Sequence, residues 1–399
     1  MASVDKRPPR TVGGAFTYRV RYRDPSGASR SKSFPKKAEA ERYANTVEAD
    51  KSRGVYLDPT LGRLTLGDYA DGWLKIQTFD ESTREAVALR LRVHIKPVLG
   101  QVPLADLRPS LIQSWLSGLQ QKLAPRTVKV ILANLSSMLS AAVDDDRLGK
   151  NPCSAGSIRA PRHVENKVVV WTLESVLAVR AHMPERFQLA ATLAAGLGLR
   201  QGEVFGLAVE DVDFLRGVVH VRRQVKIVGN RQIFALPKGG RTRDVPLAED
   251  VRDAIQAHLR AFPAVSVSLP WQLNSGQPKS FDLLLSTRER TALQRNYINS
   301  CVWKPAVKAA GLPTARTDNN GMHALRHFYA SVLLEGGASI RALADYLGHR
   351  DPGFTLRVYA HLMPQSEDTA KRAINGVFGG SQRAVNDPLC VPGVSRRAS

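Results

Sequence analysis

Hydrophobic and polar residues alternate strictly near the start of the chain. Over residues 15–23 aromatic residues and a valine occupy one side and arginines the other, which predicts a half-buried strand with an arginine face. Turn residues follow, and then a second strand over 29–34 and a helix over about 36–53. We expect residues 1–60 to form a small α+β domain, a three-stranded sheet plus a helix.

A helical pattern replaces this alternation in the next part of the chain. Between residues 64 and 150 apolar residues recur at the 3.6-residue period of a helix, and no strand-like alternation interrupts them. The predicted helices cover residues 66–76, 82–95, 107–119 and 125–143. The pattern predicts an all-helical domain, followed over 151–167 by a linker rich in Pro, Gly, Ser and charged residues.

Helical and strand-like runs mix beyond residue 168. Helices are predicted after the N-cap Thr172 and over 186–197, 249–261 and 293–310, and strands over 218–227, 232–236 and 242–247. These runs predict a mixed α/β, mainly helical domain over 168–380, with a polar tail over 381–399. The predicted fold class is therefore multidomain, with an α+β, an all-α and a mixed α/β domain in that order.

The segment 321–362 concentrates His, Arg and Tyr side chains on a run of short helices. Paired glycines end the first helix, Ser339 is suited to cap the second, and Thr355 is suited to cap the third. Separate helix surfaces and ends would thereby present His323, Arg326, His349 and Tyr359.

The net charge of the chain indicates a negatively charged partner. The chain has 57 Lys and Arg against 36 Asp and Glu, a net charge of +21, while 43% hydrophobic residues place it among globular proteins. Such a surplus favours nucleic acid as the partner, with an anionic membrane surface as the competing interpretation. The N-terminus lacks a signal-peptide pattern, and the most apolar run, 189–199, is too short to cross a bilayer. We therefore expect a soluble, cytoplasmic protein without membrane partners.

Metal and nucleotide sites are not supported by the motifs. The three cysteines are scattered without CxxC spacing, the HExxH pattern is absent, and the glycines near Arg200 lack the GxGxxG spacing. We expect no cofactor and no metal.

Six residues form a set suited to transesterification of a phosphodiester. Arginine forks match two phosphate oxygens, a tyrosine hydroxyl can attack phosphorus, and a lysine can act as general acid. The set is Arg200, Lys238, His323, Arg326, His349 and Tyr359. Each member also has an ordinary interpretation: Arg200 could pair with Glu203, Lys238 could be an exposed turn residue, and Tyr359 could be a core aromatic.

The motifs GLRQGE, HALRH, LGH and LRVYAH, in this order together with the Lys238 turn, resemble those of the tyrosine recombinases, specifically phage-type integrases. The resemblance implies that two arginines and His349 hold the scissile phosphate, Tyr359 attacks it and Lys238 protonates the leaving oxygen. His323 matches a position that assists proton transfer, and we expect it to be the base nearest the tyrosine. Glu203 matches a supporting acidic position.

The resemblance also assigns the other domains and the partners. Residues 1–60 would be an arm-type DNA-binding domain and 64–150 a core-binding domain. The DNA-contact residues are then predicted to be Arg19, Arg21, Arg23, Arg30, Lys32, Arg126 and Lys129. The implied DNA partners are double-stranded attachment sites. The recombinase would act on them as a homotetramer and exchange strands through a Holliday junction. A directionality factor and a DNA-bending host protein are the other implied partners, and the implied location is the nucleoid.

Two alternatives stay open. A resolvase of chromosome dimers or plasmids from the same family is disfavoured by the basic N-terminal sheet. A catalytically inactive DNA-binding regulator is disfavoured by the complete set of six residues.

Overall fold

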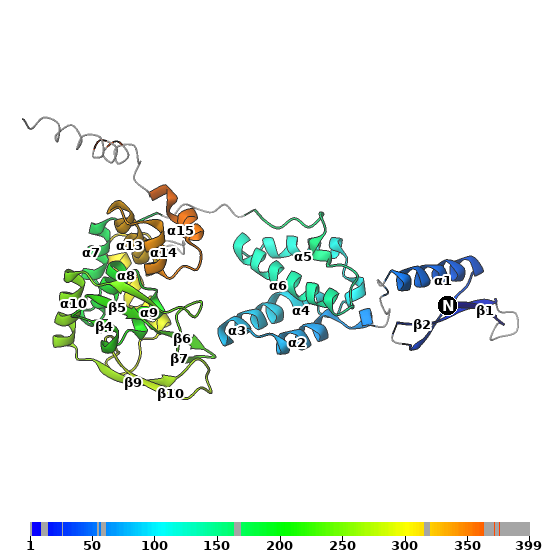
Figure 1. Cartoon of the computed structure of the whole chain (residues 1–399), viewed down its shortest axis with the longest axis horizontal. Helices are drawn as coiled ribbons and strands as arrows, with labels where there is room; N and C mark the ends of the chain where they lie inside the picture. The colour runs from blue at the N-terminus through cyan, green and yellow to red at the C-terminus, as the bar shows by residue number, and fades with distance from the viewer. Residues whose placement is uncertain are drawn as a thin grey trace, which may run out of the picture. The chain divides into compact units, whose positions relative to one another are not determined.

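The computed structural model describes most of the chain (Figure 1). The described residues are 2–8, 15–25, 27–53, 56, 61–162, 169–314 and 320–362, with Lys371 and Asn375. The chain divides into two compact units, Met1–Glu165 and Asn166–Ser399, and each is taken here by itself. The predicted tail and residues 163–167 of the predicted linker lie outside the described residues.

The N-terminal sheet is antiparallel in the order β1-β2-β3 and has a helix against one face. Its elements are β1 (Ser3–Arg7), β2 (Thr17–Arg23), β3 (Ser29–Phe34) and α1 (Lys37–Ser52). Val20 and Tyr22 of β2 are buried with Ala40, Ala44 and Val47 of α1. The predicted alternation is therefore present: β2 turns its apolar residues toward the helix and its arginines away from it.

The register of β2 and β3 divides the predicted DNA-contact residues of the sheet between its two faces. Lys32 lies opposite Val20, and Arg30 lies opposite Tyr22. Because directly opposite residues share a face, Lys32 and Arg30 lie on the side of the sheet that α1 covers. The Lys32 Nζ atom is accordingly 4.7 Å from the centre of the Tyr43 ring on α1. Arg19, Arg21 and Arg23 instead lie opposite the serines of β3, on the uncovered face.

Helices build the rest of the first unit. They are α2 (Leu66–Ile76), α3 (Glu81–Arg90), α4 (Lys96–Leu99), α5 (Pro109–Gln120) and α6 (Pro125–Asp144), with the short turns η1 (Leu61–Arg63), η3 (Leu104–Asp106) and η4 (Pro152–Ser154). The helix predicted over 82–95 is longer and irregular, because a π-helical turn, η2 (Leu91–Ile95), joins α3 to α4. Side chains of Thr65 and Asp80 cap α2 and α3 at their N-termini. These helices enclose a core separate from that of the sheet.

The start of the predicted linker contacts the helical core. Asn151 donates hydrogen bonds to the carbonyl of Ser136 at 2.9 Å and to the Ser140 hydroxyl at 2.8 Å. The backbone N–H of Arg159 donates to the Gln113 side chain at 2.7 Å. Residues up to Arg159 are therefore anchored on α5 and α6.

One described helix, α6, is long and apolar enough to cross a membrane by length and composition alone. A core helix passes the same test, and α6 buries Val128, Ile131, Leu135, Met138 and Leu139 in the helical core. The finding is weak evidence for a membrane span.

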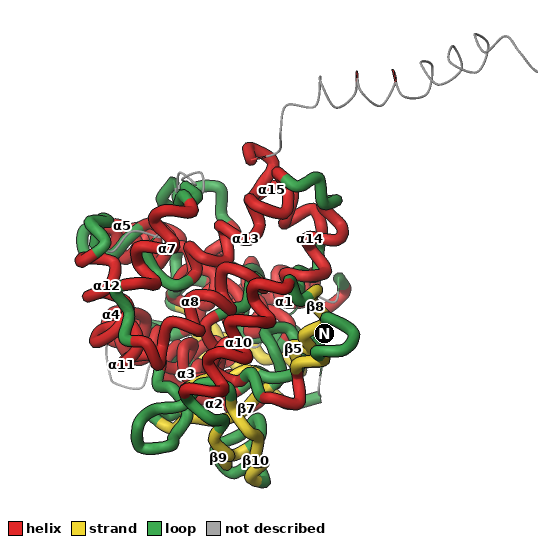
Figure 2. Tube along the Cα trace, turned by 90° about the vertical axis from the view of Figure 1, so that its left-hand side faces the viewer, coloured by secondary structure: helices red, strands yellow, loops and turns green. Residues whose placement is uncertain are grey.

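Small antiparallel sheets lie within the second unit. Their strands are β4 (Val212–Asp213), β5 (Val218–Val221) and β8 (Arg243–Pro246) in the order β4-β5-β8; β6 (Gln224–Val228) with β7 (Arg231–Ala235); and β9 (Val265–Pro270) with β10 (Pro278–Leu283). The run predicted as one strand over 218–227 is thus divided between two sheets. The hairpin of β9 and β10 was not predicted, and Figure 2 shows it in yellow at the lower edge.

Helices and helical turns make up most of the remaining described residues of the second unit. They are α7 (Leu173–Ala181), α8 (Glu185–Leu197), α9 (Gln201–Gly206), η5 (Val209–Asp211), α10 (Glu249–Ala261), α11 (Arg295–Tyr297), η6 (Ile298–Trp303), α12 (Lys304–Ala309), α13 (His323–Glu335), α14 (Ile340–Leu347), α15 (Pro352–Tyr359) and η7 (Ala360–Leu362). The helix predicted over 293–310 contains a second π-helical turn, η6.

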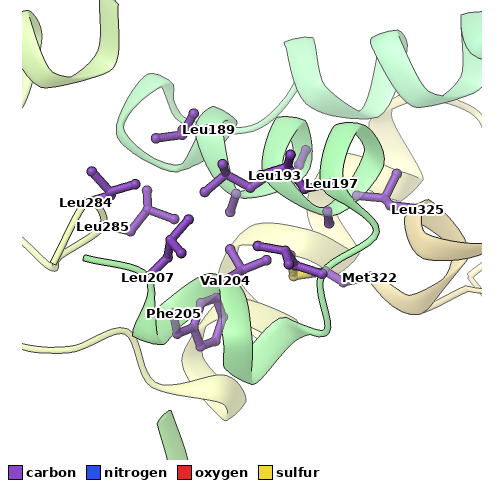
Figure 3. Packing of buried hydrophobic residues seen from close by; sticks show 14 of the residues in the cluster. Leu189, Leu193, Leu197, Val204, Phe205, Leu207, Leu284, Leu285, Met322 and Leu325 are labelled. Carbon is purple, nitrogen blue, oxygen red and sulfur yellow. The ribbon is translucent and has the colours of Figure 1, made fainter. Parts of the chain in front are cut away.

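The core between α8, α9 and α13 positions the residues of interest. One cluster buries Leu193 and Leu197 of α8, Val204 of α9, Met322 just before α13 and Leu325 on α13 (Figure 3). Close packing of these side chains holds the start of α9 and the first turns of α13 in a fixed relation. The predicted multidomain fold class, with α+β, all-α and mixed α/β parts, is confirmed.

Candidate active site

Arg326 lies at the centre of the site and is 1% exposed. Its guanidinium donates to the carbonyl of Gly198 at 2.6 Å, to the carbonyl of Leu347, and to Nε2 of His349 at 3.2 Å. Burial, and then the positive charge of Arg200, lower the pKa of Arg326 to about 9. The side chain therefore stays cationic at neutral pH, and its orientation is set by three separate segments of the chain.

Arg200 and Glu203 form the ion pair that the sequence allowed. Arg200 is the N-cap residue of α9, and its backbone N–H and its guanidinium each donate to the Glu203 carboxylate at 2.9 Å. Burial raises the pKa of Glu203, but hydrogen bonds and charge from Arg243, and then the charges of Arg200 and Arg326, lower it to about 2. Glu203 is thus an ionised acceptor that orients Arg200.

Arg243, at the start of β8, completes this arrangement and was not predicted. Its guanidinium donates to both Glu203 oxygens, at 3.1 and 2.7 Å, and its Nε donates to the carbonyl of Tyr346 at 2.6 Å. The side chain is 6% exposed. Arg243 therefore links the start of β8, the Glu203 carboxylate and the end of α14. No sequence signal separates it from the exposed Arg241 two residues earlier.

His349 follows the C-terminal end of α14 and is held through both ring nitrogens. Since its Nε2 accepts from Arg326, its Nδ1 carries the proton and donates to the Thr355 hydroxyl at 2.7 Å. This bond satisfies the Thr355 hydroxyl, which lies within α15 and is 0% exposed. The predicted cap at Thr355 is therefore wrong: Asp351 caps the helix and accepts from the Gly353 N–H at 2.8 Å.

Tyr359 ends α15 and is 1% exposed, with its hydroxyl oxygen 2.8 Å from Nδ1 of His327. Burial raises the pKa of Tyr359 to about 12. His323, which we expected nearest the hydroxyl, instead packs its ring edge-on against His327, with the ring centres 4.7 Å apart. The two histidines are one turn apart on α13, and the second of them reaches α15. The spacing of four residues within HALRH was a signal that could have identified His327.

Lys238 lies in an exposed turn between β7 and β8, as predicted. The Gly240 N–H donates to the carbonyl of Pro237 at 2.9 Å and closes the turn. Desolvation, and then the charges of Arg326, Arg200, His349 and Lys238, lower the pKa of His323 to about 4. The Lys238 charge therefore acts on His323, one of the other predicted residues.

The predicted DNA-contact residues differ in their surroundings. Arg126 and Lys129 are exposed on the first turns of α6. On the uncovered face of the N-terminal sheet, Arg19 donates to the Ser31 hydroxyl at 2.7 Å and Arg21 pairs with Asp5 at 2.8 Å. Arg21 is exposed and Arg19 is half-buried, and each keeps a polar partner on the sheet.

Comparison with protein families settles the class. The "Phage integrase family" matches residues 172–366, and its "N-terminal SAM-like domain" matches residues 65–120. The chain belongs to the tyrosine recombinases of the phage integrase family. It is a site-specific DNA recombinase, and its predicted enzyme class is confirmed.

Similar proteins cover most of this recombinase. A "Tyrosine recombinase XerC-like" from Caldanaerobacter subterraneus subsp. tengcongensis is 26% identical over 89% of this chain and 94% of the relative. The "Putative prophage phiRv2 integrase" of Mycobacterium tuberculosis is 28% identical over 83% and 84% of the two chains. The "Integrase" of Mycobacterium phage L5 is 27% identical over 74% of each.

Solved structures share the fold of the recombinase. The Tn1549 transposon integrase in complex with a circular intermediate DNA superposes with a TM-score of 0.65 at 19% identity, over 79% of this chain and 99% of the other. A lambda integrase dimer bound to a COC' core site superposes with a TM-score of 0.55 at 18% identity, over 88% and 93%.

Proposed function

We propose that this recombinase integrates and excises a mobile DNA element, with the predicted six residues carrying the chemistry. Support comes from the cluster itself: burial, and then the arginine charges, lower the pKa of His323 and of His349 to about 4, and the charges of Arg326 and Arg200 also act on the buried Tyr359 hydroxyl. A phosphodiester anion is the ligand that such a cluster favours, because arginine forks bind pairs of phosphate oxygens. The observation that carries the proposal is Arg326, which is held by Gly198 and Leu347 beside His349.

In the proposed reaction, Arg200, Arg326 and His349 hold the scissile phosphate. The Tyr359 oxygen attacks phosphorus and forms a 3′-phosphotyrosine, while the bond to the 5′ oxygen breaks and Lys238 donates a proton to that oxygen. The fixed cations stabilise the charge that develops on the phosphate oxygens, without reorganisation during the reaction. His323 assists phosphate contact, and Glu203 orients Arg200. Because the phosphotyrosine conserves the energy of the phosphodiester, rejoining needs no cofactor.

We extend the proposal to the DNA sites and the assembly by analogy with solved structures. A lambda integrase tetramer has been solved bound to a Holliday junction, with a TM-score of 0.54 to this chain. By analogy, we propose a homotetramer that exchanges strands at double-stranded attachment sites. Residues 64–150 would bind the core site through Arg126 and Lys129, and residues 1–60 would bind arm sites. A directionality factor and a DNA-bending host protein would act with it at the nucleoid in the cytoplasm.

A suicide substrate carrying a nick near the cleavage position tests the nucleophile. Tyr359→Phe removes only the hydroxyl oxygen, so we expect no covalent protein–DNA adduct and DNA affinity within about twofold of wild type. Tyr346→Phe, on the neighbouring α14, is the matched control and should form the adduct. Peptide mapping of the wild-type adduct should find Tyr359, and an adduct on another residue would contradict the proposal.

A further inference from the structure

His327 contacts the atom that the proposed reaction uses as nucleophile. Its Nδ1 is 2.8 Å from the Tyr359 hydroxyl oxygen, and the two ring centres are 5.6 Å apart. His327 comes from α13 and Tyr359 from α15, so the contact joins the helix that carries Arg326 to the helix that carries the nucleophile. The match of HALRH to the family motif gave a role to its first histidine and none to its second.

The other histidines of the cluster are engaged elsewhere. His349 uses Nε2 to accept from Arg326 and Nδ1 to donate to Thr355, so neither ring nitrogen is free to take a proton from the tyrosine. His323 contacts the ring of His327 instead of the hydroxyl. Among the described residues, His327 therefore has the ring nitrogen best placed to receive the hydroxyl proton.

We propose that His327 is the proton acceptor for Tyr359 in strand cleavage. The inference rests on the proposed function of Tyr359 as the nucleophile. As the tyrosine oxygen bonds to phosphorus, its O–H bond breaks and the proton passes to Nδ1 of His327, which becomes an imidazolium. The bond between phosphorus and the 5′ oxygen breaks, and that oxygen takes a proton from the Lys238 ammonium.

Rejoining reverses both transfers. The incoming 5′ hydroxyl gives its proton back to the Lys238 amine and attacks phosphorus. The tyrosine oxygen leaves and recovers its proton from the His327 imidazolium. Protons, bonds and charge are therefore restored after each strand exchange, and no further reactant is required.

The electrostatics of the site make this role depend on the bound phosphate. Burial, and then the charges of His323 and Arg326, lower the pKa of His327 to about 3, so before DNA binds the ring is neutral but is a weak base. A phosphate bound by Arg200 and Arg326 would offset their positive charge and make the imidazolium easier to form. Substrate binding would thus raise the pKa of His327 in the complex in which Tyr359 reacts.

Two substitutions separate proton transfer from positioning. His327→Asn keeps a hydrogen-bond acceptor near the position of Nδ1 but cannot take the proton. His327→Ala leaves a space that free imidazole can enter. In single-turnover cleavage of the suicide substrate we expect both variants to lose about 10²–10⁴-fold in rate, the usual contribution of a general base. Added imidazole should raise the rate of His327→Ala about tenfold or more and leave His327→Asn and wild type unchanged.

Controls separate the possible failures. His182→Asn, at an exposed histidine after α7, should cleave like wild type. Cleavage by His327→Asn within threefold of wild type would overturn the proposal, and so would a folded His327→Ala that imidazole does not accelerate. DNA affinity and melting temperature are measured for every variant, so that the rescue is read on folded protein. Mapping of the wild-type adduct to a residue other than Tyr359 would instead overturn the proposed function.

Discussion

Two regions of this recombinase place arginines in opposite environments: the active site buries its central arginine, and the N-terminal sheet leaves its arginines accessible to water. Arg326 is 1% exposed and is held by two backbone carbonyls and a histidine. Arg19, Arg21 and Arg23 lie on the uncovered face of the N-terminal sheet, opposite serines. The first environment fixes one guanidinium at one place, whereas the second distributes several charges over a surface that water reaches.

The contrast teaches what each region can recognise. A fixed, desolvated fork is suited to a single phosphate and to the charge that develops on it during reaction. Exposed cations are suited to a polyanion, because each phosphate that they neutralise releases a counterion from the duplex. Substitutions should therefore affect reaction rate in the first region and salt dependence in the second.

The largest expected effect is on stability, at Arg243. Arg243→Ala leaves the buried Glu203 carboxylate without its strongest partner, and breaking a buried ion pair on one side costs about 3–5 kcal/mol of unfolding free energy. Urea unfolding followed by circular dichroism measures the loss. Adding Glu203→Gln to Arg243→Ala should recover part of it, because the double variant no longer buries a carboxylate that has lost one of its two arginine partners. A single variant as stable as wild type would show that Arg243 does not support the site.

Arg326→Lys should reduce cleavage while leaving DNA binding nearly intact. An ammonium cannot reproduce the fork, so we expect a loss of about 10²–10³-fold in single-turnover rate, as for removal of a preorganised donor. The exposed Arg341→Lys, on α14, is the matched control. Gel-shift affinities measured beside the rates distinguish lost chemistry from lost binding. Near wild-type cleavage would assign Arg326 a structural role.

The smallest effects concern the two faces of the N-terminal sheet. One variant replaces Arg19, Arg21 and Arg23 with Ser, and its binding constant K is measured against salt concentration on DNA with full attachment sites. The slope of log K against log salt should become less steep by about 0.9 for each phosphate that the protein no longer neutralises. Cleavage of a short core site should not change. Replacing Arg30 and Lys32, on the face that α1 covers, is the matched comparison and should change the slope less. An equal change from both sets would contradict the separation of the faces.

The fold was largely predictable because its helices carry strong local signals. Thr172 caps α7 as predicted, and the apolar period of α2 and α10 reproduces their observed extent. The β9–β10 hairpin was missed although residues 265–269 alternate, since a short run with serines on its outer face resembles a loop. The face of Lys32 depends on pairing between strands, which alternation within one strand does not reveal.

The site was predictable where its residues follow a motif and not where tertiary packing selects them. Arg200, Arg326, His349 and Tyr359 were identified together, and the structure gathers them. Arg243 escaped because its role depends on a carboxylate 40 residues away in the chain. Thr355 was assigned to a cap because sequence spacing cannot show that its hydroxyl meets His349.

Gly198, the first residue of the GLRQGE motif, has a role that depends on residues far away in the chain. Its backbone is left-handed, with φ +62°, and a Cβ at this position would lie 2.4 Å from the Tyr329 ring. Its carbonyl accepts from Arg326, 128 residues later in the chain. A substitution at Gly198 would therefore displace the carbonyl that accepts from Arg326. For this reason we expect the tolerance of that position to amino-acid change to be set by its left-handed backbone and by Tyr329, which follows the distant HALRH motif by two residues.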